Sequence, residues 1–566
     1  MPSAQSGLPF GVVARNKCMT EVLKRKFVTA PFLLGTLLLL CALTFYYFAV
    51  LKVDYSKTAL LDLGPGPDAI EYFAQAKAML HDGWPSIQIG YDKLPSRFPF
   101  GYPVLIVPWL KLLPTSQAIL APFRTNQTVG LLLLLGVFVT YAYLAMPISG
   151  GFAVLLLATM PAFFTFCRSS LSDITGSTFA VFAFIFVYLG LEEKRRWQIY
   201  FGAILLGVAF DIRTQLVFFA PLLLAMALFP GTQSRVTRLF HCVAVLLAFA
   251  IAASPAFLIN YVWFHNPFRT GYEFWVPFFG VTHNMFSVHN IPKHAAMLWA
   301  EMTARWQTYS VANIFGTGTH FVPPFILLTC IGFLFIKVSR FVLCALLSGF
   351  SLFACTATNF FAVCRYYLPV LILLVAVAVL AVDWAAKMIL ARQRVLVACL
   401  IFGLFLLSCI GFPSQSGFRP KGGRAQAWDA LHFTDPPRES VKFAAAKELV
   451  NEVGKQPGIV LSDIDPVYLN TLLPQQFVAA PVDQTHPYKW SYIWRYGKPE
   501  ALAFVEKGLA KSLPVYALFV PEKEMTSQLS RLPSISGYRW NEAENSSAKA
   551  VILKLAPTTF QEKAPP

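Results

Sequence analysis

The chain has 566 residues, of which 56% are hydrophobic and only 13% are charged, and its mean hydropathy is +0.57. This composition excludes an ordinary soluble globule and predicts a polytopic α-helical membrane protein. The formal net charge of +17 does not indicate nucleic-acid binding, because much of the excess lies beside predicted membrane helices, where it orients the chain and meets anionic lipid. Membrane lipids, and no nucleic acid, are therefore expected partners.

The first apolar run, residues 27–50, is long enough to span a bilayer. Basic residues are concentrated in the segment before it, so the positive-inside rule places residues 1–26 in the cytoplasm. The run is longer than the apolar core of a signal peptide and has no evident small-residue cleavage site, which predicts a retained helix. The loop that follows, residues 51–126, is then extracytoplasmic.

Residues 27–412 contain about eleven such runs. The loops predicted to be cytoplasmic carry basic clusters, in agreement with the positive-inside rule. At Asp211 to Thr214 the polar break could separate two short helices or kink a single one. After the first run, helices are expected near 127–147, 151–167, 174–191, 198–211, 214–229, 240–263, 321–337, 341–357, 368–386 and 395–412.

The first external loop contains the most informative carboxylate, Asp68. It opens a predicted amphipathic helix with Tyr72, Ala76 and Leu80 on one stripe, and Gly83 is placed to end this helix. Residues 95–103 are rich in proline and aromatic residues, and 104–113 are apolar but too short to span, which predicts a helix along the membrane surface. A carboxylate placed just outside the bilayer makes Asp68 a candidate site residue.

The next outward turn carries Arg168 and Asp173, which are five residues apart at the membrane surface. Asp173 could face Asp68. Ionisable residues at membrane level are costly and are commonly functional, although a plain Arg168–Asp173 ion pair at a wet helix end is the alternative.

Metal ligation receives weak support from the spacing of the candidate ligands. Asp68 and Asp173 could share a divalent ion, but no third ligand is evident. The three histidines His283, His289 and His294 fit no tight zinc motif and are better interpreted as ordinary loop residues. No cofactor is therefore assigned from the sequence, and a divalent metal remains the open alternative. Asp211 and Arg213 are expected to form a structural pair.

The tail changes character after residue 412, where charged residues of both signs appear in near balance. Residues 413–566 are therefore predicted to form a soluble extracytoplasmic α/β domain. A second large loop, 264–320, is predicted on the same side, so chemistry or recognition is expected there. Strands are expected at 458–462, 476–480 and 515–520, and helices at 440–453 and 498–512.

Several short motifs occur in an order that resembles the GT-C glycosyltransferases. The Asp68 helix and the element Pro99-Phe100-Gly101-Tyr102-Pro103 are followed by Arg168 to Asp173, Asn260 to Tyr272, and Arg365-Tyr366-Tyr367-Leu368-Pro369. The resemblance covers roughly residues 25–390 and is strongest to the polyprenyl-phosphate-sugar-dependent branch, which includes the aminoarabinose transferase of lipid A and the protein O-mannosyltransferases. One departure is that Ala69 follows Asp68, where many members carry a second acid, and the next carboxylate here is Glu71.

This resemblance implies an inverting transfer of a sugar from a polyprenyl-phosphate donor to a lipid, glycan or protein acceptor. The reaction would take place on the extracytoplasmic face of the plasma membrane, the inner membrane in a bacterium, with Asp68 as the general base. Arg168 and Arg365 are the favoured phosphate ligands, although Arg365 could instead be an interfacial residue whose side chain snorkels. The remaining candidates for substrate contact are Asp173, Tyr72, Arg97, Arg269 and Lys293.

Two other functions compete with a transferase: a secondary transporter or lipid-linked-sugar flippase, and a non-catalytic subunit of polysaccharide assembly. Transporters often contain related halves and polar residues at the middle of the membrane. No internal repeat is evident here, and the notable ionisable residues are predicted at the outer edge, which favours the transferase.

Overall fold

The computed structural model describes residues 30–52, 68–225, 234–275, 285–303, 340–362, 364–389, 441–454, 456–473, 477–482, 498–520, 529–542 and 550–558. The segment predicted to be cytoplasmic, 1–26, and the helices expected at 321–337 and 395–412 lie outside these residues.

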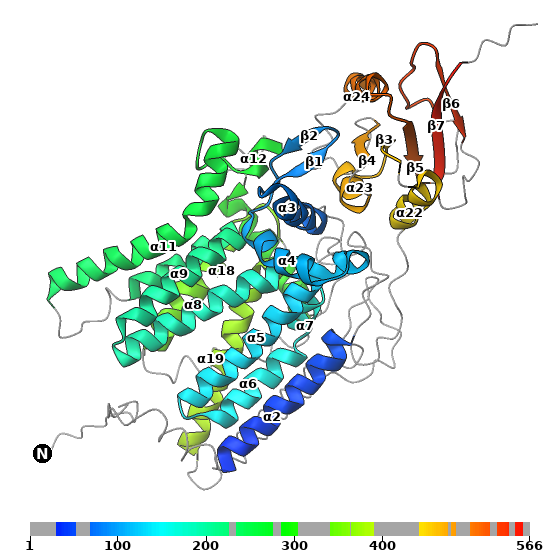
Figure 1. Ribbon diagram of the computed structural model, residues 1–566. Coiled ribbons are helices and arrows are strands. Elements are labelled where there is room, and N and C mark those ends of the chain that lie inside the picture. The colour runs from blue at the N-terminus through cyan, green and yellow to red at the C-terminus, as the bar shows by residue number, and fades with distance from the viewer. Residues whose placement is uncertain are drawn as a thin grey trace, which may run out of the picture.

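Long apolar helices lie side by side in a bundle (Figure 1). α2 (Ala30–Tyr46) follows one edge of the bundle and α11 (Arg235–Phe264) follows the opposite edge. Within the described residues, six segments are long and apolar enough to cross a bilayer, which confirms a polytopic helical membrane protein. These segments are Ala30–Leu51, Thr115–Tyr143, Asp173–Glu193, Val236–Phe264, Arg340–Ala357 and Arg365–Asp383.

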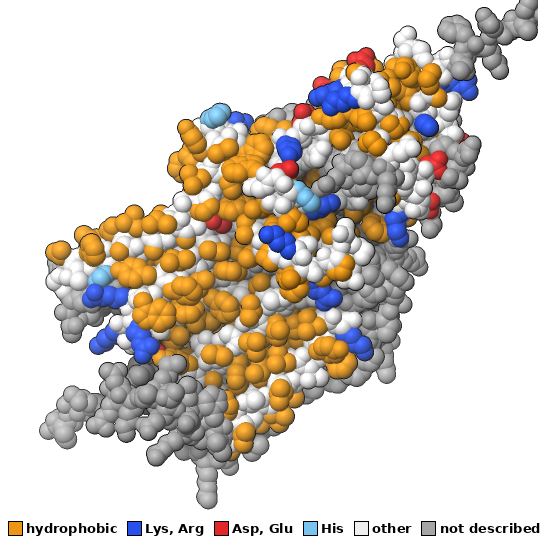
Figure 2. Space-filling model, viewed as in Figure 1, with side chains coloured by type: hydrophobic (Ala, Val, Ile, Leu, Met, Phe, Trp, Pro, Cys, Tyr) orange, Lys and Arg blue, Asp and Glu red, His pale blue; other side chains and the backbone are white. Residues whose placement is uncertain are grey.

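Between the two edges lie α5 (Ala121–Tyr143), α8 (Asp173–Glu193), α9 (Arg196–Ile212) and α19 (Leu368–Ile389). Figure 2 shows hydrophobic side chains covering the visible face of the bundle, with Lys and Arg gathered near its ends. This distribution suits a lipid-facing surface bounded by two polar interfaces.

The predicted helix at 151–167 is wrong as a single element, because α6 (Pro147–Thr159) and α7 (Pro161–Cys167) are separate. Met160 between them has an extended backbone, with φ −68° and ψ 120°. A residue that precedes proline is disfavoured in the helical region, since the proline ring meets its backbone. Pro161 therefore ends the first helix and begins the second.

The ambiguous break near residue 213 separates two elements. α9 ends at Ile212, Arg213 is extended with φ −149° and ψ 109°, and a 3-10 helix, η3, then covers Thr214–Leu224. An extended residue at this point turns the Arg213 side chain away from the direction that a continuous helix would give it.

The predicted amphipathic helix after the first span is confirmed as α3 (Asp68–Asp82). Gly83 follows it in the left-handed region, with φ +72°, and its amide donates to the carbonyl of Met79. A small hairpin follows, formed by β1 (Ile87–Ile89) and β2 (Asp92–Leu94).

The predicted surface helix is α4 (Gly101–Leu112). It begins three residues before the expected start, so Pro103 lies in its first turn. Amides in the first turn of a helix make no intrahelical hydrogen bond, so the lack of an amide proton in Pro103 removes none, and the helix tolerates the proline.

Residues 441–558, here called the sheet domain, contain a five-stranded sheet in the order β4-β3-β5-β7-β6. β4, β3 and β5 run parallel, whereas β7 and β6 are antiparallel to their neighbours. The helices are α22 (Val441–Val453), α23 (Pro466–Leu472) and α24 (Lys498–Ala510). The strands are β3 (Gly458–Ser462), β4 (Phe477–Pro481), β5 (Val515–Phe519), β6 (Tyr538–Glu542) and β7 (Val551–Pro557).

Alternate strand residues face opposite sides of this sheet. Ile459 and Leu461 pack with α24, whereas Val460 belongs to a core shared with α22 and α23. The shared core continues into the helical part, where it includes Ile70 of α3 and Tyr102 of α4. α3, β1 and β2 accordingly lie between the bundle and the sheet (Figure 1), and this is called the sheet end of the bundle below.

Candidate active site

A cavity of about 430 Å³ opens at the sheet end of the bundle. α3, the loop 95–100, the break at Arg213, the end of α11 and residues 359–366 supply its walls. Its lining includes the polar and charged side chains Asp68, Gln75, Arg213, Glu273 and Arg365. The rest of the lining is mainly apolar and aromatic, and includes Phe210, Phe218, Phe257, Trp263, Phe264 and Phe268. The cavity is therefore amphipathic.

Four charged residues, three of which line the cavity, form a connected ion cluster. Arg365 Nη2 lies 2.8 Å from Asp68 Oδ2, and Arg365 Nη1 lies 3.7 Å from Asp173 Oδ2. Asp173 Oδ1 in turn lies 2.6 Å from Arg213 Nη1. The expected meeting of Asp68 and Asp173 thus occurs through a guanidinium that lies between them.

The two carboxylates differ in their exposure. The Asp173 side chain is 1% exposed and is held by two cations, whereas the Asp68 side chain is 15% exposed and lines the cavity. Asp68 is also the first residue of α3, where the helix dipole stabilises a negative charge. Asp68 is therefore the carboxylate that a bound substrate can reach.

Tyr366 supports both guanidinium groups. Its ring lies 5.4 Å from the guanidinium carbon of Arg213 and 5.5 Å from that of Arg365, both cation–π distances. Tyr366 itself lines the cavity. The two cations are thus held on one aromatic ring, with Asp173 bridging them.

Tyr72 is buried beside the cluster and also lines the cavity. Its hydroxyl is 2.9 Å from the hydroxyl of Ser172, and its ring centroid is 5.0 Å from those of Phe98 and Tyr102. Burial raises the pKa of Tyr72 well above its ordinary value, so the phenol stays protonated. Tyr72 can therefore donate a hydrogen bond but cannot act as a base near neutral pH.

Glu71, the second carboxylate of α3, is fully buried and accepts hydrogen bonds from the loop 95–100. Its Oε1 accepts from Arg97 Nε at 2.7 Å, and its Oε2 accepts from the Ser96 hydroxyl at 2.7 Å and the Arg97 amide at 3.0 Å. Burial raises the pKa of Glu71, and the Arg97 guanidinium opposes this rise. Glu71 does not line the cavity, so it supports the wall that Arg97 forms.

The other predicted phosphate ligands lie outside the cavity lining. Arg168 is half-buried just after α7. Arg269 is exposed, with its guanidinium 5.7 Å from the Phe264 ring, and Lys293 is exposed, with its ammonium 5.2 Å from the Phe360 ring. Of the five predicted cations, Arg97 and Arg365 line the cavity.

The expected Asp211–Arg213 pair is wrong. Arg213 pairs with Asp173 instead, because its extended backbone points its side chain into the ion cluster. Asp211 is buried, and within the described residues its Oδ1 has no hydrogen-bond partner.

Metal ligation gains no support from the described residues, which contain no group of three or more His, Cys, Asp and Glu side chains placed to hold an ion. His294 uses both ring nitrogens, each 2.8 Å from its partner, the Tyr367 hydroxyl and the Asn359 carbonyl. His283 lies outside the described residues. Between Asp68 and Asp173 a guanidinium already occupies the space that a divalent ion would need.

Comparison with known proteins gives independent information on this architecture. Residues 116–258 match the family model described as dolichyl-phosphate-mannose-protein mannosyltransferase. Crystal structures of ArnT from Cupriavidus metallidurans align with 92% of this chain and 97% of their own. The apo structure gives a TM-score of 0.57 at 14% identity, and the one bound to undecaprenyl phosphate gives 0.55 at 13%. The resemblance to the GT-C glycosyltransferases is confirmed. No protein with curated annotation matches the sequence.

The family match covers part of the helical bundle, from before α5 to within α11. It includes Asp173 and Arg213, whereas Asp68 and Arg365 lie outside it. The sequence did not assign Arg213 of the ion cluster, or Tyr366 beside it, to the site. Arg213 did carry a signal, since it is a cation at a polar break between apolar runs.

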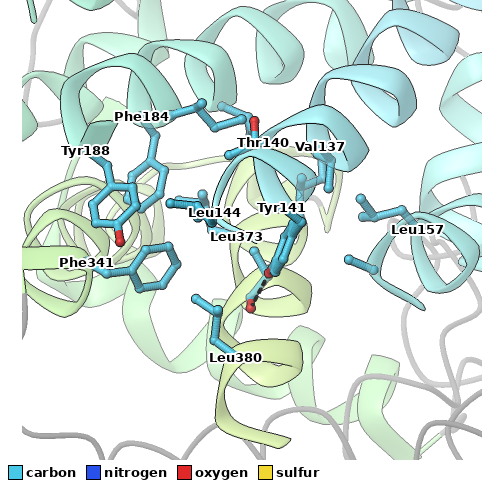
Figure 3. A pocket seen from close by; sticks show the side chains of 15 residues that line it. Val137, Thr140, Tyr141, Leu144, Leu157, Phe184, Tyr188, Phe341, Leu373 and Leu380 are labelled. Atoms are coloured by element: carbon cyan, nitrogen blue, oxygen red, sulfur yellow. Dashed lines mark hydrogen bonds between the residues drawn. The ribbon is translucent and has the colours of Figure 1, made fainter. Parts of the chain in front are cut away.

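A second pocket lies inside the helical bundle (Figure 3). Its volume is about 40 Å³, and its lining includes Val137, Leu157, Phe184 and Leu373. Tyr141 reaches across it to donate to the Ala376 carbonyl at 2.9 Å. The space is too small for a polyprenyl chain and is explained by helix packing.

Proposed function

We propose that the chain transfers a sugar from a polyprenyl-phosphate donor to an acceptor, with inversion, and that Asp68 is the general base. The observation that carries this proposal is the position of Asp68, a carboxylate in an amphipathic cavity beside two guanidinium groups. The GT-C fold supports it.

The reaction needs little more than positioning and charge compensation. The anomeric carbon loses its bond to the phosphate oxygen and gains one to the acceptor oxygen or nitrogen, while the acceptor proton passes to Asp68. Negative charge accumulates on the departing phosphate. Arg365 and Arg213 can stabilise that charge through paired hydrogen bonds, and Tyr366 holds both side chains in place.

The amphipathic lining supports a lipid-linked donor in particular. The apolar lining residues, among them Phe257 and Trp263 of α11, suit the first isoprene units, and the polar lining residues suit phosphate and sugar. ArnT in the comparison structure binds undecaprenyl phosphate, which is a lipid of this class.

The proposed location of the site is the extracytoplasmic face of the membrane. The basic segment before the first span supports this orientation, because it places the sheet end of the bundle outside. The acceptor would then be a lipid, glycan or protein of the cell envelope that approaches beside the sheet domain.

The direct test follows radiolabelled sugar from a panel of polyprenyl-phosphate donors into membrane-extract acceptors, with the purified full chain. Labelled product that depends on the chain is the expected result. Movement of intact donor across a liposome membrane without product formation would favour a flippase, and no transfer with any donor would contradict the proposal.

A further inference from the structure

Asp68 and Arg365 both line the cavity and form an ion pair with each other. The pair joins α3 to the start of α19, with 2.8 Å between the Asp68 Oδ2 and Arg365 Nη2 atoms. The Asp68 Oδ2 atom already accepts a hydrogen bond from the guanidinium, so it is not free to meet an acceptor hydroxyl or amine. The guanidinium is likewise already engaged at the position where a donor phosphate would bind.

The neighbouring pair has a different character. Asp173 is buried behind the cavity wall and contacts both Arg213 and Arg365, so it fixes the two guanidiniums whether or not Asp68 is present. Asp68 has Arg365 as its one ion-pair partner among the described residues and is open to the cavity. Asp68 is therefore the member of the cluster that an incoming anion can displace.

We propose that the donor phosphate replaces Asp68 on Arg365, and that this exchange releases the Asp68 carboxylate to act as base. The inference rests on the proposed function and adds to it an order in which the two substrates bind. The donor must bind before the acceptor can be deprotonated, so an acceptor that arrives first meets an inactive base.

The charges of the cluster balance through such a cycle. Two carboxylates offset two guanidiniums, and a donor phosphodiester adds one negative charge. During transfer the electron pair of the broken bond goes to the phosphate oxygen, and the acceptor proton goes to Asp68. The phosphate gains one negative charge as Asp68 loses one, so the total in the cavity stays constant. Loss of that proton restores the Asp68 anion, which can then compete for Arg365 and help to expel the product.

This exchange predicts that the loss of the base improves binding. Asp68→Asn removes the competitor for Arg365, so we expect it to bind a polyprenyl phosphate about tenfold more tightly than the wild type, the order of one charged hydrogen bond. Asp82→Asn is the matched control. It makes the same charge change on the same helix, where Asp82 pairs with Lys93 outside the cavity, and it should leave the affinity unchanged.

The experiment measures the binding of geranylgeranyl phosphate to the full chain in detergent, with geranylgeraniol as the probe that lacks phosphate. Asp68→Asn, Arg365→Gln and the double variant form a mutant cycle with the wild type. We expect Asp68→Asn to bind the phosphate more tightly only when Arg365 is present, and the affinity for geranylgeraniol to be the same in all four proteins.

Each other outcome overturns the exchange in a distinct way. Equal affinity in wild type and Asp68→Asn would show that Asp68 does not occupy the phosphate position, and would leave the proposed function intact. Weaker binding by Asp68→Asn would show that the carboxylate helps to hold phosphate. Tighter binding that persists in the Arg365→Gln background would indicate simple charge repulsion. A wild type that binds neither probe would contradict the proposed function itself.

Discussion

The position of the loop that carries Arg97 into the cavity wall depends on its buried hydrogen bonds and ion pair with Glu71. Removing one partner of a buried ion pair leaves the other charge without compensation and costs about 3–5 kcal/mol. We therefore expect Glu71→Gln to lower the thermal stability of the full chain in detergent far more than Asp82→Asn, whose side chain is exposed in part. Equal melting temperatures for the two variants would contradict this assignment.

Arg213 is predicted to contribute more to donor binding than Arg168. Arg213→Gln removes one of the two cations proposed to bind the donor phosphate and leaves Arg365 as the remaining ion-pair partner of Asp173. We expect the donor KM to rise about tenfold, the order of one charged hydrogen bond. Arg168→Gln, on a side chain outside the cavity lining, should change KM little. A larger effect from Arg168→Gln would restore the sequence-based ranking of these two residues.

The sequence predicted part of this site for a clear physical reason. Asp68, Asp173 and Arg365 are ionisable residues at the edges of apolar runs, where a charge is costly without a role. The partner of Arg213 could not be predicted, because Asp173 lies 40 positions away and the nearest acid in sequence was Asp211. Local spacing gives neighbours along the chain, whereas the ion cluster is assembled from α3, α8, the α9–η3 break and residue 365.

Among the secondary-structure elements around the cavity, the loop 95–100 is fixed from two sides. Glu71 of α3 holds it on one side, and on the other the indole of Trp275 in α12 (Gly271–Trp275) donates to the Pro95 carbonyl at 2.7 Å. Gly271 allows α12 this close approach, since a Cβ atom there would meet the Ser96 carbonyl oxygen at 1.9 Å.

Gly271→Ala should therefore push the loop and α12 apart. We expect a loss of about 1–3 kcal/mol in stability from overpacking, together with a raised donor KM, because the loop lines the cavity. Gly349→Ala is the matched control, since its added Cβ would lie 3.6 Å from Leu373 Cδ1, an ordinary contact. Similar melting temperatures and KM values for the two variants would show that the loop can move away from α12 without loss of stability or donor affinity.

Hydropathy predicted most of the described membrane helices, because each of them presents a continuous apolar surface to the protein interior or to lipid. The breaks at Met160 and Arg213 were harder to place. Pro161 indicated a break, but the apolar length of 151–167 favoured a single helix. The extended conformation of Arg213, which brings its side chain to Asp173, is not shown by any local sequence pattern.

At the scale of the whole molecule, the sheet domain is bonded directly to the elements that carry Asp68. The Lys77 ammonium of α3 donates to the Thr471 carbonyl at 2.7 Å, and the Gly90 amide of the hairpin donates to the Ala479 carbonyl at 2.8 Å. The side-chain amide of Asn470 donates to both the Gln88 and Ala479 carbonyls, each at 2.9 Å. The sheet domain thus supports the position of α3.

Asn470→Ala should affect activity although the residue lies outside the cavity lining. The change leaves the Ala479 amide, which donates to Asn470 Oδ1 at 2.6 Å, without its side-chain acceptor and costs about 1–3 kcal/mol. We expect a lower melting temperature and a reduced transfer rate. Asn541→Ala, on the exposed strand β6, should change neither, and a transfer rate unaffected by Asn470→Ala would argue that the sheet domain does not position α3.

Asp68 is proposed as the base of a sugar transfer from polyprenyl phosphate. The most direct test compares the turnover of a lipid-linked sugar donor by wild type, Asp68→Asn and Asp82→Asn, with geranylgeranyl phosphate binding as the check on a folded site. We predict that Asp68→Asn loses about 10²–10⁴-fold in turnover while it still binds the phosphate, and that Asp82→Asn matches the wild type. Turnover by a folded Asp68→Asn equal to that of the wild type would contradict the claim.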